Sequence, residues 1–250
     1  MTCFWLVILF VLGLCTGSFL NVVIYRLPRG ESITFDRSHC PFCGKQLVWY
    51  DLIPVLSYLL LLGRCRSCHT RISIKYPIVE LLTGIIFIVL FHHFGATLVF
   101  LKYLFLSALL VAVSFIDLEH YIIPNSLVIT GLVGGVVLNL AARDVGVVSA
   151  LIGIFVTSGF LLLIALVSKG GMGGGDIKLA AVTGLFLGWP LAPFGLFLGA
   201  CVGGVVAIFL LLFRIKGRKD PLPFGPFIAV GTFFAFLYGF DVINWYLQYF

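Results

Sequence analysis

The sequence contains few charged residues, and acidic residues are the scarcest of them. Charged residues make up 10% of the 250 residues, and ten residues are Asp or Glu. A soluble globular domain carries about 25% charged residues, so this shortage excludes an ordinary soluble domain. Apolar residues are in excess instead: 61% of the chain is hydrophobic and the mean hydropathy is +1.17. The composition predicts a polytopic membrane protein.

Two familiar sequence signals are also missing. The N-terminus, Met1 to Trp5, has no basic segment, and no small-residue cleavage site follows its apolar run. This excludes a cleaved secretory signal peptide and favours a retained first span. No glycine-rich loop follows a predicted strand, so a nucleotide pocket of the Rossmann type is excluded as well.

Eight apolar runs are candidates for membrane spans, which need about 20 residues each. They lie near residues 3–24, 78–94, 98–116, 126–142, 147–167, 179–191, 194–213 and 224–243. The run at 179–191 is short and requires either tilt or a start inside the glycine loop before it. We therefore expect an all-α fold of about eight transmembrane helices. Its expected parts are a first transmembrane helix (1–24), a cytoplasmic insert with four cysteines (25–77) and a seven-helix membrane domain (78–250).

The basic residues gather on one predicted side of the membrane. Alternating spans place fourteen of the sixteen Lys and Arg residues in the loops of one side, and only Lys102 and Arg143 on the other. Basic loops face the cytoplasm, so both termini are expected outside. The same rule explains the net charge of +6 without a nucleic-acid partner.

The polar insert contains two C-x2-C pairs, Cys40 with Cys43 and Cys65 with Cys68, separated by 21 residues. Two such pairs at about this spacing indicate a tetrahedral zinc site with four thiolate ligands, which is structural because no coordination position is open. The alternative is four reduced cysteines in a cytosolic loop, and a disulfide is disfavoured on that side of the membrane. His39 and His69 flank the pairs and are possible replacement ligands.

An apolar stretch at residues 49–62 lies between the two cysteine pairs. It is too short to span a bilayer comfortably, and Pro54 interrupts it. The simplest interpretation is an interfacial helix that lies on the inner leaflet.

Asp117 and Asp176 lie at the ends of apolar runs, where ionisable groups are costly and mark functional sites. Each has an ordinary explanation: Asp117 ends a span, and Asp176 is a candidate helix N-cap. Capping does not require the glycine-rich run at 170–175, whereas close approach of the backbone to a ligand or helix does. Since both aspartates are expected on the cytoplasmic side, they are candidates for an acid/base pair of carboxyl groups.

Several motifs in one order carry a resemblance to a known family. These are Gly173-Gly174-Gly175-Asp176, Asp117 with Pro124, the segment 17–28, the tetracysteine insert, the segment 71–82, and Pro223-Phe224-Gly225-Pro226. Together they resemble the type IV prepilin leader peptidase/N-methyltransferase family, whose members are aspartic peptidases of the GxGD type. One departure is Asn125, where many relatives have aspartate. It does not affect the expected catalytic residues.

The resemblance implies a bifunctional enzyme of the bacterial cytoplasmic (inner) membrane. Whether its substrates serve type IV pili, type II secretion or DNA uptake is left open. It implies cleavage of the basic leader of prepilins and pseudopilins at the cytoplasmic face, with Asp117 and Asp176 activating water. It also implies methylation of the new N-terminus by S-adenosylmethionine, for which Gly63 and Glu80 are the candidate residues. Glu80 also has a structural interpretation, as an ion-pair partner of Arg71 or Lys75.

Other functions stay open on the sequence alone. A peptidase without methyltransferase activity would share the aspartates, but the preflagellin type is expected to lack the insert. A polytopic transporter would place Asp176 at mid-bilayer, and a noncatalytic assembly subunit would tolerate Asp117→Asn. The expected partners are prepilin substrates and the lipid bilayer, and the oligomeric state is left open.

Overall fold

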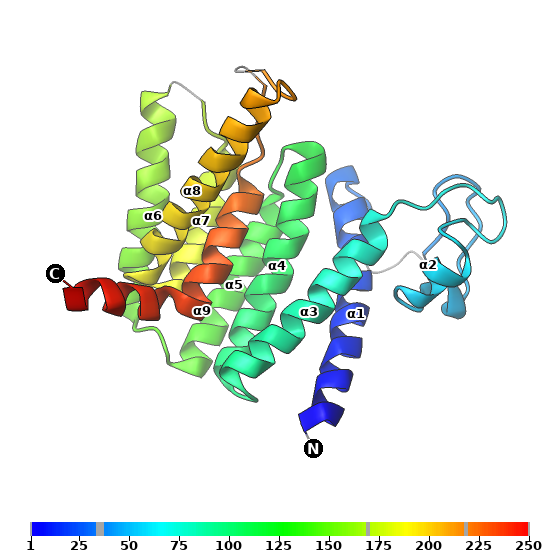
Figure 1. The fold of residues 1–250 in the computed structure, drawn as a ribbon, viewed down its shortest axis with the longest axis horizontal. Coiled ribbons are helices and arrows are strands. Elements are labelled where there is room, and N and C mark those ends of the chain that lie inside the picture. Colours follow the sequence, from blue (N-terminus) through cyan, green and yellow to red (C-terminus); the bar gives the residue numbers. More distant parts are fainter. Residues whose placement is uncertain (1, 34–37, 169–170, 218–219, 250) are drawn as a thin grey trace. The chain divides into compact units, whose positions relative to one another are not determined.

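The computed structural model describes residues 2–33, 38–168, 171–217 and 220–249, and it divides into two compact units, Met1–Ala96 and Thr97–Phe250 (Figure 1). Each unit is described by itself. Four basic residues that the sequence assigns to the cytoplasmic side lie outside the described residues, as does Gly170. These four are Arg37, Lys169, Arg218 and Lys219. The division into parts 1–24, 25–77 and 78–250 stays a prediction.

The first unit consists of two long helices and the loop that joins them. Its elements are α1 (Thr2–Arg26), η1 (Leu27–Arg29), η2 (Trp49–Leu52), α2 (Leu56–Leu60) and α3 (Lys75–Phe94). Helices α1 and α3 approach closely at glycines, because a Cβ atom on Gly13 would lie 2.6 Å from Cα of Gly84. A Cβ atom on Gly17 would lie 2.6 Å from Cα of Glu80. Small residues at such spacing let membrane helices pack backbone to backbone.

The second unit is a bundle of six helices. They are α4 (Leu98–His120), α5 (Asn125–Ala142), α6 (Val147–Val167), α7 (Gly174–Leu187), α8 (Leu191–Leu212) and α9 (Gly225–Tyr249), and Figure 1 shows consecutive helices running in alternate directions. Glycines again set the closest contacts: a Cβ atom on Gly153 of α6 would lie 2.5 Å from the carbonyl oxygen of Gly184 in α7. The starts of α7 and α9 therefore lie at the same end of the bundle as the last turn of α4.

The chain is an all-helical multi-pass membrane protein, as the sequence predicts. Among the described residues, seven helices are long and apolar enough to cross a membrane, and no strand is present beyond two isolated bridges. The remaining expected span, the run at 179–191, corresponds to α7. Its 14 residues extend about 21 Å, which is shorter than a hydrocarbon core of about 30 Å. Helix α7 begins at Gly174, inside the glycine loop, which is one of the two expected ways to lengthen the run at 179–191.

Hydrogen bonds with α5 and α6 satisfy backbone groups around the C-terminal end of α7. The side-chain amide of Asn139 on α5 donates to the carbonyl oxygen of Leu185 at 2.6 Å. The amide of Trp189, just after α7, donates to the carbonyl oxygen of Ser149 at 3.1 Å. Backbone groups in a bilayer must find partners within the protein, and these two bonds supply partners where α7 stops short.

An ion pair between a buried lysine and an exposed aspartate lies at the start of α4, the end of that helix opposite to Asp117. Lys102 is fully buried, and its Nζ atom lies 2.9 Å from both carboxylate oxygens of Asp144 in the loop between α5 and α6. The Lys102 ammonium also lies 5.0 Å from the centre of the Tyr103 ring. The positive charge of Lys102, which the sequence predicts on the outer side of the membrane, is thus balanced by the carboxylate of Asp144.

Candidate functional site

The four cysteines of the insert form one cluster. The Sγ atoms of Cys40, Cys43, Cys65 and Cys68 all lie within 4.8 Å of one another, and the Sγ atoms of Cys40 and Cys68 are 3.8 Å apart. Thiolates bound to zinc at about 2.3 Å in a tetrahedron have sulfur–sulfur distances of about 3.8 Å. The residues therefore fit a zinc ion, and the cluster that the sequence predicts is formed.

The two cysteine pairs are held by matching turns. The amide of Gly44 donates to the carbonyl oxygen of Cys40 at 2.9 Å, and the amide of His69 donates to that of Cys65 at 3.0 Å. Gly44 and His69 occupy the same place in their turns, and both have positive φ angles, of 69° and 55°. His69 therefore shapes a turn, and among the described residues neither His69 nor His39 belongs to the ligand cluster.

Thr70 prepares one thiol for metal binding. Its hydroxyl lies 3.3 Å from Sγ of Cys68. The pKa of the Cys68 thiol is lowered to about 6, mainly by its hydrogen bond to the Thr70 side chain and, second, by its hydrogen bond to the Thr70 backbone. Metal ions bind thiolates, so a lowered pKa favours the binding form at neutral pH.

Gly63 and Glu80, the candidates for methyl transfer, both have roles in the fold of the insert. Gly63 has a φ angle of 67°, and a Cβ atom there would lie 2.9 Å from Oη of Tyr58. Oε2 of the buried Glu80 accepts the amide of Val55 at 2.8 Å, and Ser18 of α1 also bonds to this carboxyl group. These contacts do not by themselves define a pocket for S-adenosylmethionine, so the part of these two residues in methyl transfer stays a prediction.

Asp117 is buried inside the last turn of α4 rather than beyond its end. Its Oδ2 atom accepts the backbone amide of Gly225, the first residue of α9, at 2.9 Å. Its carbonyl oxygen accepts the amide of Tyr121, which ends the helix with a φ angle of 56°. The side chain is therefore fixed by a helix N-terminus distant in sequence, where backbone amides favour a negative charge.

Asp176 is the third residue of α7, so the interpretation of Asp176 as the N-cap is wrong: Gly173 occupies that position. The half-buried carboxyl group of Asp176 reaches back to the amide of Gly173 and lies within electrostatic range of Asp117. A Cβ atom on Gly175 would lie 3.0 Å from Cβ of Ile123, in the loop after α4. The glycine run thus brings α7 against the end of α4, and none of its described members has a positive φ angle.

Two lysines connect the loops around this carboxyl pair. Nζ of Lys178 donates to Oδ1 of Asn125, at the start of α5, at 2.8 Å. Nζ of Lys216 donates to Oη of Tyr121 at 3.2 Å and to the carbonyl oxygen of Pro221 at 2.7 Å. Asn125 is therefore a hydrogen-bond acceptor for a lysine two residues after Asp176.

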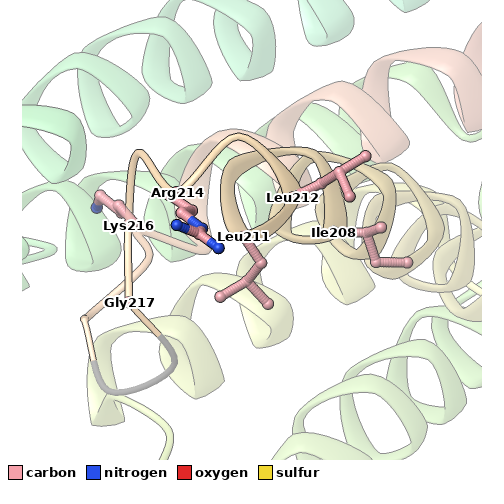
Figure 2. Close-up of a pocket in the computed structure, with 6 residues that line it drawn as sticks. All are labelled: Ile208, Leu211, Leu212, Arg214, Lys216 and Gly217. Atoms are coloured by element: carbon pink, nitrogen blue, oxygen red, sulfur yellow. The ribbon is translucent and has the colours of Figure 1, made fainter.

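An open hollow of about 560 Å³ lies at the end of α8 (Figure 2). Its lining residues are Ile208, Leu211, Leu212, Arg214, Lys216 and Gly217. Figure 2 shows the leucine and isoleucine side chains along the helix, and the two basic side chains beyond its last turn. Neither aspartate lines this hollow, so it is distinct from the carboxyl pair.

The fold and the sites define a class: a helical multi-pass membrane protein with a four-cysteine cluster that fits a metal ion and a pair of aspartates held at helix N-termini. Two family models match the chain, the Bacterial Peptidase A24 N-terminal domain over residues 11–94 and the Type IV leader peptidase family over residues 103–208. The chain belongs to the type IV leader peptidase family. It is therefore an enzyme of the peptidase class.

Curated relatives support the same assignment. The chain is similar to proteins named "Prepilin leader peptidase/N-methyltransferase" from Myxococcus xanthus, with 43% identity over 86% of this chain and 65% of the relative, and from Bacillus subtilis, with 37% identity over 96% of this chain and 97% of the relative. A relative of the same name from Aeromonas salmonicida is 36% identical over 96% of this chain and 93% of its own length. No solved structure matches the chain.

Proposed function

We propose that this chain cleaves the leader peptide of type IV prepilins and pseudopilins and then N-methylates the new N-terminal residue. The proposal is supported by the family and by the double name of the relatives. The observation that carries it is the aspartate pair: Asp117 accepts the amide that starts α9, and Asp176 accepts the amide that precedes α7. These bonds orient both carboxyl groups at one end of the bundle.

Cleavage by such a pair requires one shared proton. Two close carboxyl groups resist simultaneous ionisation, so one is a carboxylate and the other an acid. The carboxylate takes a proton from water, and the water oxygen adds to the carbonyl carbon of the scissile bond. The acid donates a hydrogen bond to the carbonyl oxygen as it becomes negative. The C–N bond then breaks as the carboxyl group that took the proton from water delivers it to the leaving amine.

The reaction is proposed to take place at the cytoplasmic face of the bacterial inner membrane, with both termini outside. The proposal is supported by the distribution of basic residues in the sequence: the loops that follow Asp117 and precede Asp176 belong to the predicted side with most Lys and Arg residues, and basic loops face the cytoplasm. A prepilin helix held in the bilayer would present its leader junction at this boundary. The bilayer is therefore a partner in presenting the substrate.

Two cofactors are proposed, a structural zinc ion and S-adenosylmethionine. The four cysteines would hold zinc in a closed site, and the bound ion would contribute folding energy to a loop with little core of its own. S-adenosylmethionine is the proposed methyl donor, and it supplies the methyl group for the amine that cleavage exposes. Gly63 and Glu80 are kept as proposed residues for this second activity.

The aspartate assignment is tested by leader cleavage of a co-expressed prepilin in membranes. Asp117→Asn and Asp176→Asn are each expected to abolish cleavage while the protein stays in the membrane at normal amounts. Glu119→Gln is the matched control, because Glu119 is an exposed carboxyl residue two positions further along α4. Normal processing by either Asn variant would exclude the aspartyl mechanism.

Methyl transfer is tested separately by mass spectrometry of the mature pilin. In membranes supplied with S-adenosylmethionine, the mature N-terminus is expected to carry one methyl group. Cleaved but unmethylated pilin would support the peptidase-only alternative and leave the aspartate assignment intact.

A further inference from the structure

The loop between α1 and α3 exposes large apolar side chains. Trp49 is 77% exposed, Leu60 83% and Leu62 85%, and Leu56 and Leu59 of α2 are exposed as well. Apolar area left in water costs about 25 cal/mol per Å². Contiguous apolar patches of this kind mark a surface that meets another phase or partner.

This surface lies beside the first turns of a membrane helix. Oε2 of Glu80 binds the amide of Val55, directly before α2, at 2.8 Å. Glu80 is five residues beyond Lys75, where α3 begins, which corresponds to about 7 Å along the helix axis. Because α3 is a candidate membrane span, this bond holds the start of α2 beside the first two turns of that span.

The backbone is bent sharply to reach this position. The amide of Leu56 donates to the carbonyl oxygen of Pro54 at 2.6 Å, and Val55 between them has φ 61° and ψ −49°. This is the strained form of the γ-turn, which is rare, above all for a β-branched residue. Such strain persists only where the surroundings hold it, and the buried carboxyl group of Glu80 is the group that does so.

The same loop also carries exposed basic side chains. Lys45, Arg64 and Arg71 are exposed. Arg66 is bonded to Asp51, with its Nε atom 2.9 Å from Oδ1. Lys and Arg residues near a membrane surface are attracted to anionic headgroups.

We propose that residues 55–62 lie in the headgroup region of an anionic lipid bilayer, with Leu56, Leu60 and Leu62 in contact with lipid, and that they anchor the tetracysteine cluster to the membrane surface. The lipid is favoured over a protein partner because the loop joins two membrane helices, and because its bond to Glu80 fixes it beside one of them. The exposed basic residues of the loop, Lys45, Arg64 and Arg71, are complementary in charge to an anionic leaflet. This anchoring does not depend on either proposed enzymatic activity.

The test measures lipid contact of the full chain in vesicles of phosphatidylcholine and phosphatidylglycerol. A fluorescent amino acid is installed at position 60 or, as the control, at the exposed position 45. Bromine atoms on the acyl chains are expected to quench the probe at 60 severalfold more than the probe at 45, and aqueous iodide is expected to do the reverse. Equal iodide quenching at both positions would overturn the proposal. Protection of position 60 from both quenchers would overturn it too, because a second copy or another protein segment would then cover the surface.

The role of Glu80 is tested with the same probe at position 60. Glu80→Leu removes the acceptor for the amide of Val55, and it is expected to raise iodide quenching severalfold. Glu80→Gln keeps an acceptor oxygen and is expected to retain most of the protection. Metal content of both variants verifies that the cysteine cluster is formed. An unchanged probe in Glu80→Leu would overturn the role of Glu80 as the anchor.

Discussion

The backbone amide of Gly225 donates a hydrogen bond of 2.9 Å to Oδ2 of Asp117, although the two residues are 108 positions apart. The bond joins the first residue of α9 to the last turn of α4. It gives one carboxyl group of the pair a fixed orientation through a backbone donor. Gly225 is therefore a positioning residue of the proposed active site.

Gly225→Ala is expected to lower kcat for leader cleavage with little change in KM. The new Cβ atom would lie 2.8 Å from Oδ2 of Asp117, which forces the carboxyl group or the start of α9 to shift. Misplacement of a catalytic group by about 1 Å costs about 10²-fold in rate. The matched control is Gly204→Ala in α8, where the added Cβ atom meets nothing within 4 Å. Equal activity of the two variants would contradict the role of Gly225.

The cysteine cluster predicts the metal content of the purified protein. Elemental analysis is expected to give about one zinc ion per chain, since four thiolates complete one tetrahedral site. Cys40→Ser and Cys65→Ser are expected to lose the metal and to lower the unfolding temperature. Cys201→Ser is the control, because Cys201 lies in α8, outside the cluster. A metal-free parent protein, or full zinc in Cys40→Ser, would refute the zinc assignment.

The ion pair of Lys102 and Asp144 predicts a stability effect away from the aspartates. Asp144→Ala leaves the ammonium of the fully buried Lys102 without its partner, and it is expected to lower the free energy of unfolding by about 3 kcal/mol. The double variant Lys102→Met/Asp144→Ala removes both charges and is expected to recover most of this loss. Denaturant unfolding in detergent measures both. A double variant less stable than Asp144→Ala would contradict this account.

The contact between α1 and α3 predicts sensitivity to one methyl group. In Gly17→Ala the new Cβ atom would meet Cα of Glu80 at 2.6 Å, and overpacking of this kind costs about 1–3 kcal/mol. Thermal unfolding in detergent is expected to occur at a lower temperature than in the parent. Gly159→Ala in α6 is the control, since nothing lies within 4 Å of its added Cβ atom. An unchanged unfolding temperature for Gly17→Ala would contradict this prediction, because it would mean that the close packing of α1 against α3 does not contribute to the free energy of unfolding.

The sequence predicts the features that depend on local spacing. Two C-x2-C pairs predict a cluster because each pair forms its own turn, and the four Sγ atoms do gather. The apolar runs predict the long helices, since a span is defined by length and hydropathy alone. For the stretch at 49–62 the sequence predicts a single interfacial helix, whereas the structure has two short helical segments, η2 and α2. Pro54 lies between them.

Features that depend on distant partners could not be predicted in the same way. The motif containing Gly225 is visible in the sequence, but its bond to Asp117 requires α9 and α4 to meet. The sequence offers Arg71 and Lys75 as partners for Glu80, whereas its carboxyl group holds the amide of Val55. Every residue except proline has the same backbone amide, so the residue types in a sequence do not reveal which amide will donate to a given carboxyl group.

The two compact units divide the chemistry of the chain. Every described group that holds Asp117 or Asp176 follows Ala96, and every ligand of the cysteine cluster precedes it. The boundary falls in the short connection between α3 and α4. The proposed peptidase site and the proposed zinc site are therefore each formed within one unit, so each is encoded by a continuous segment of the chain.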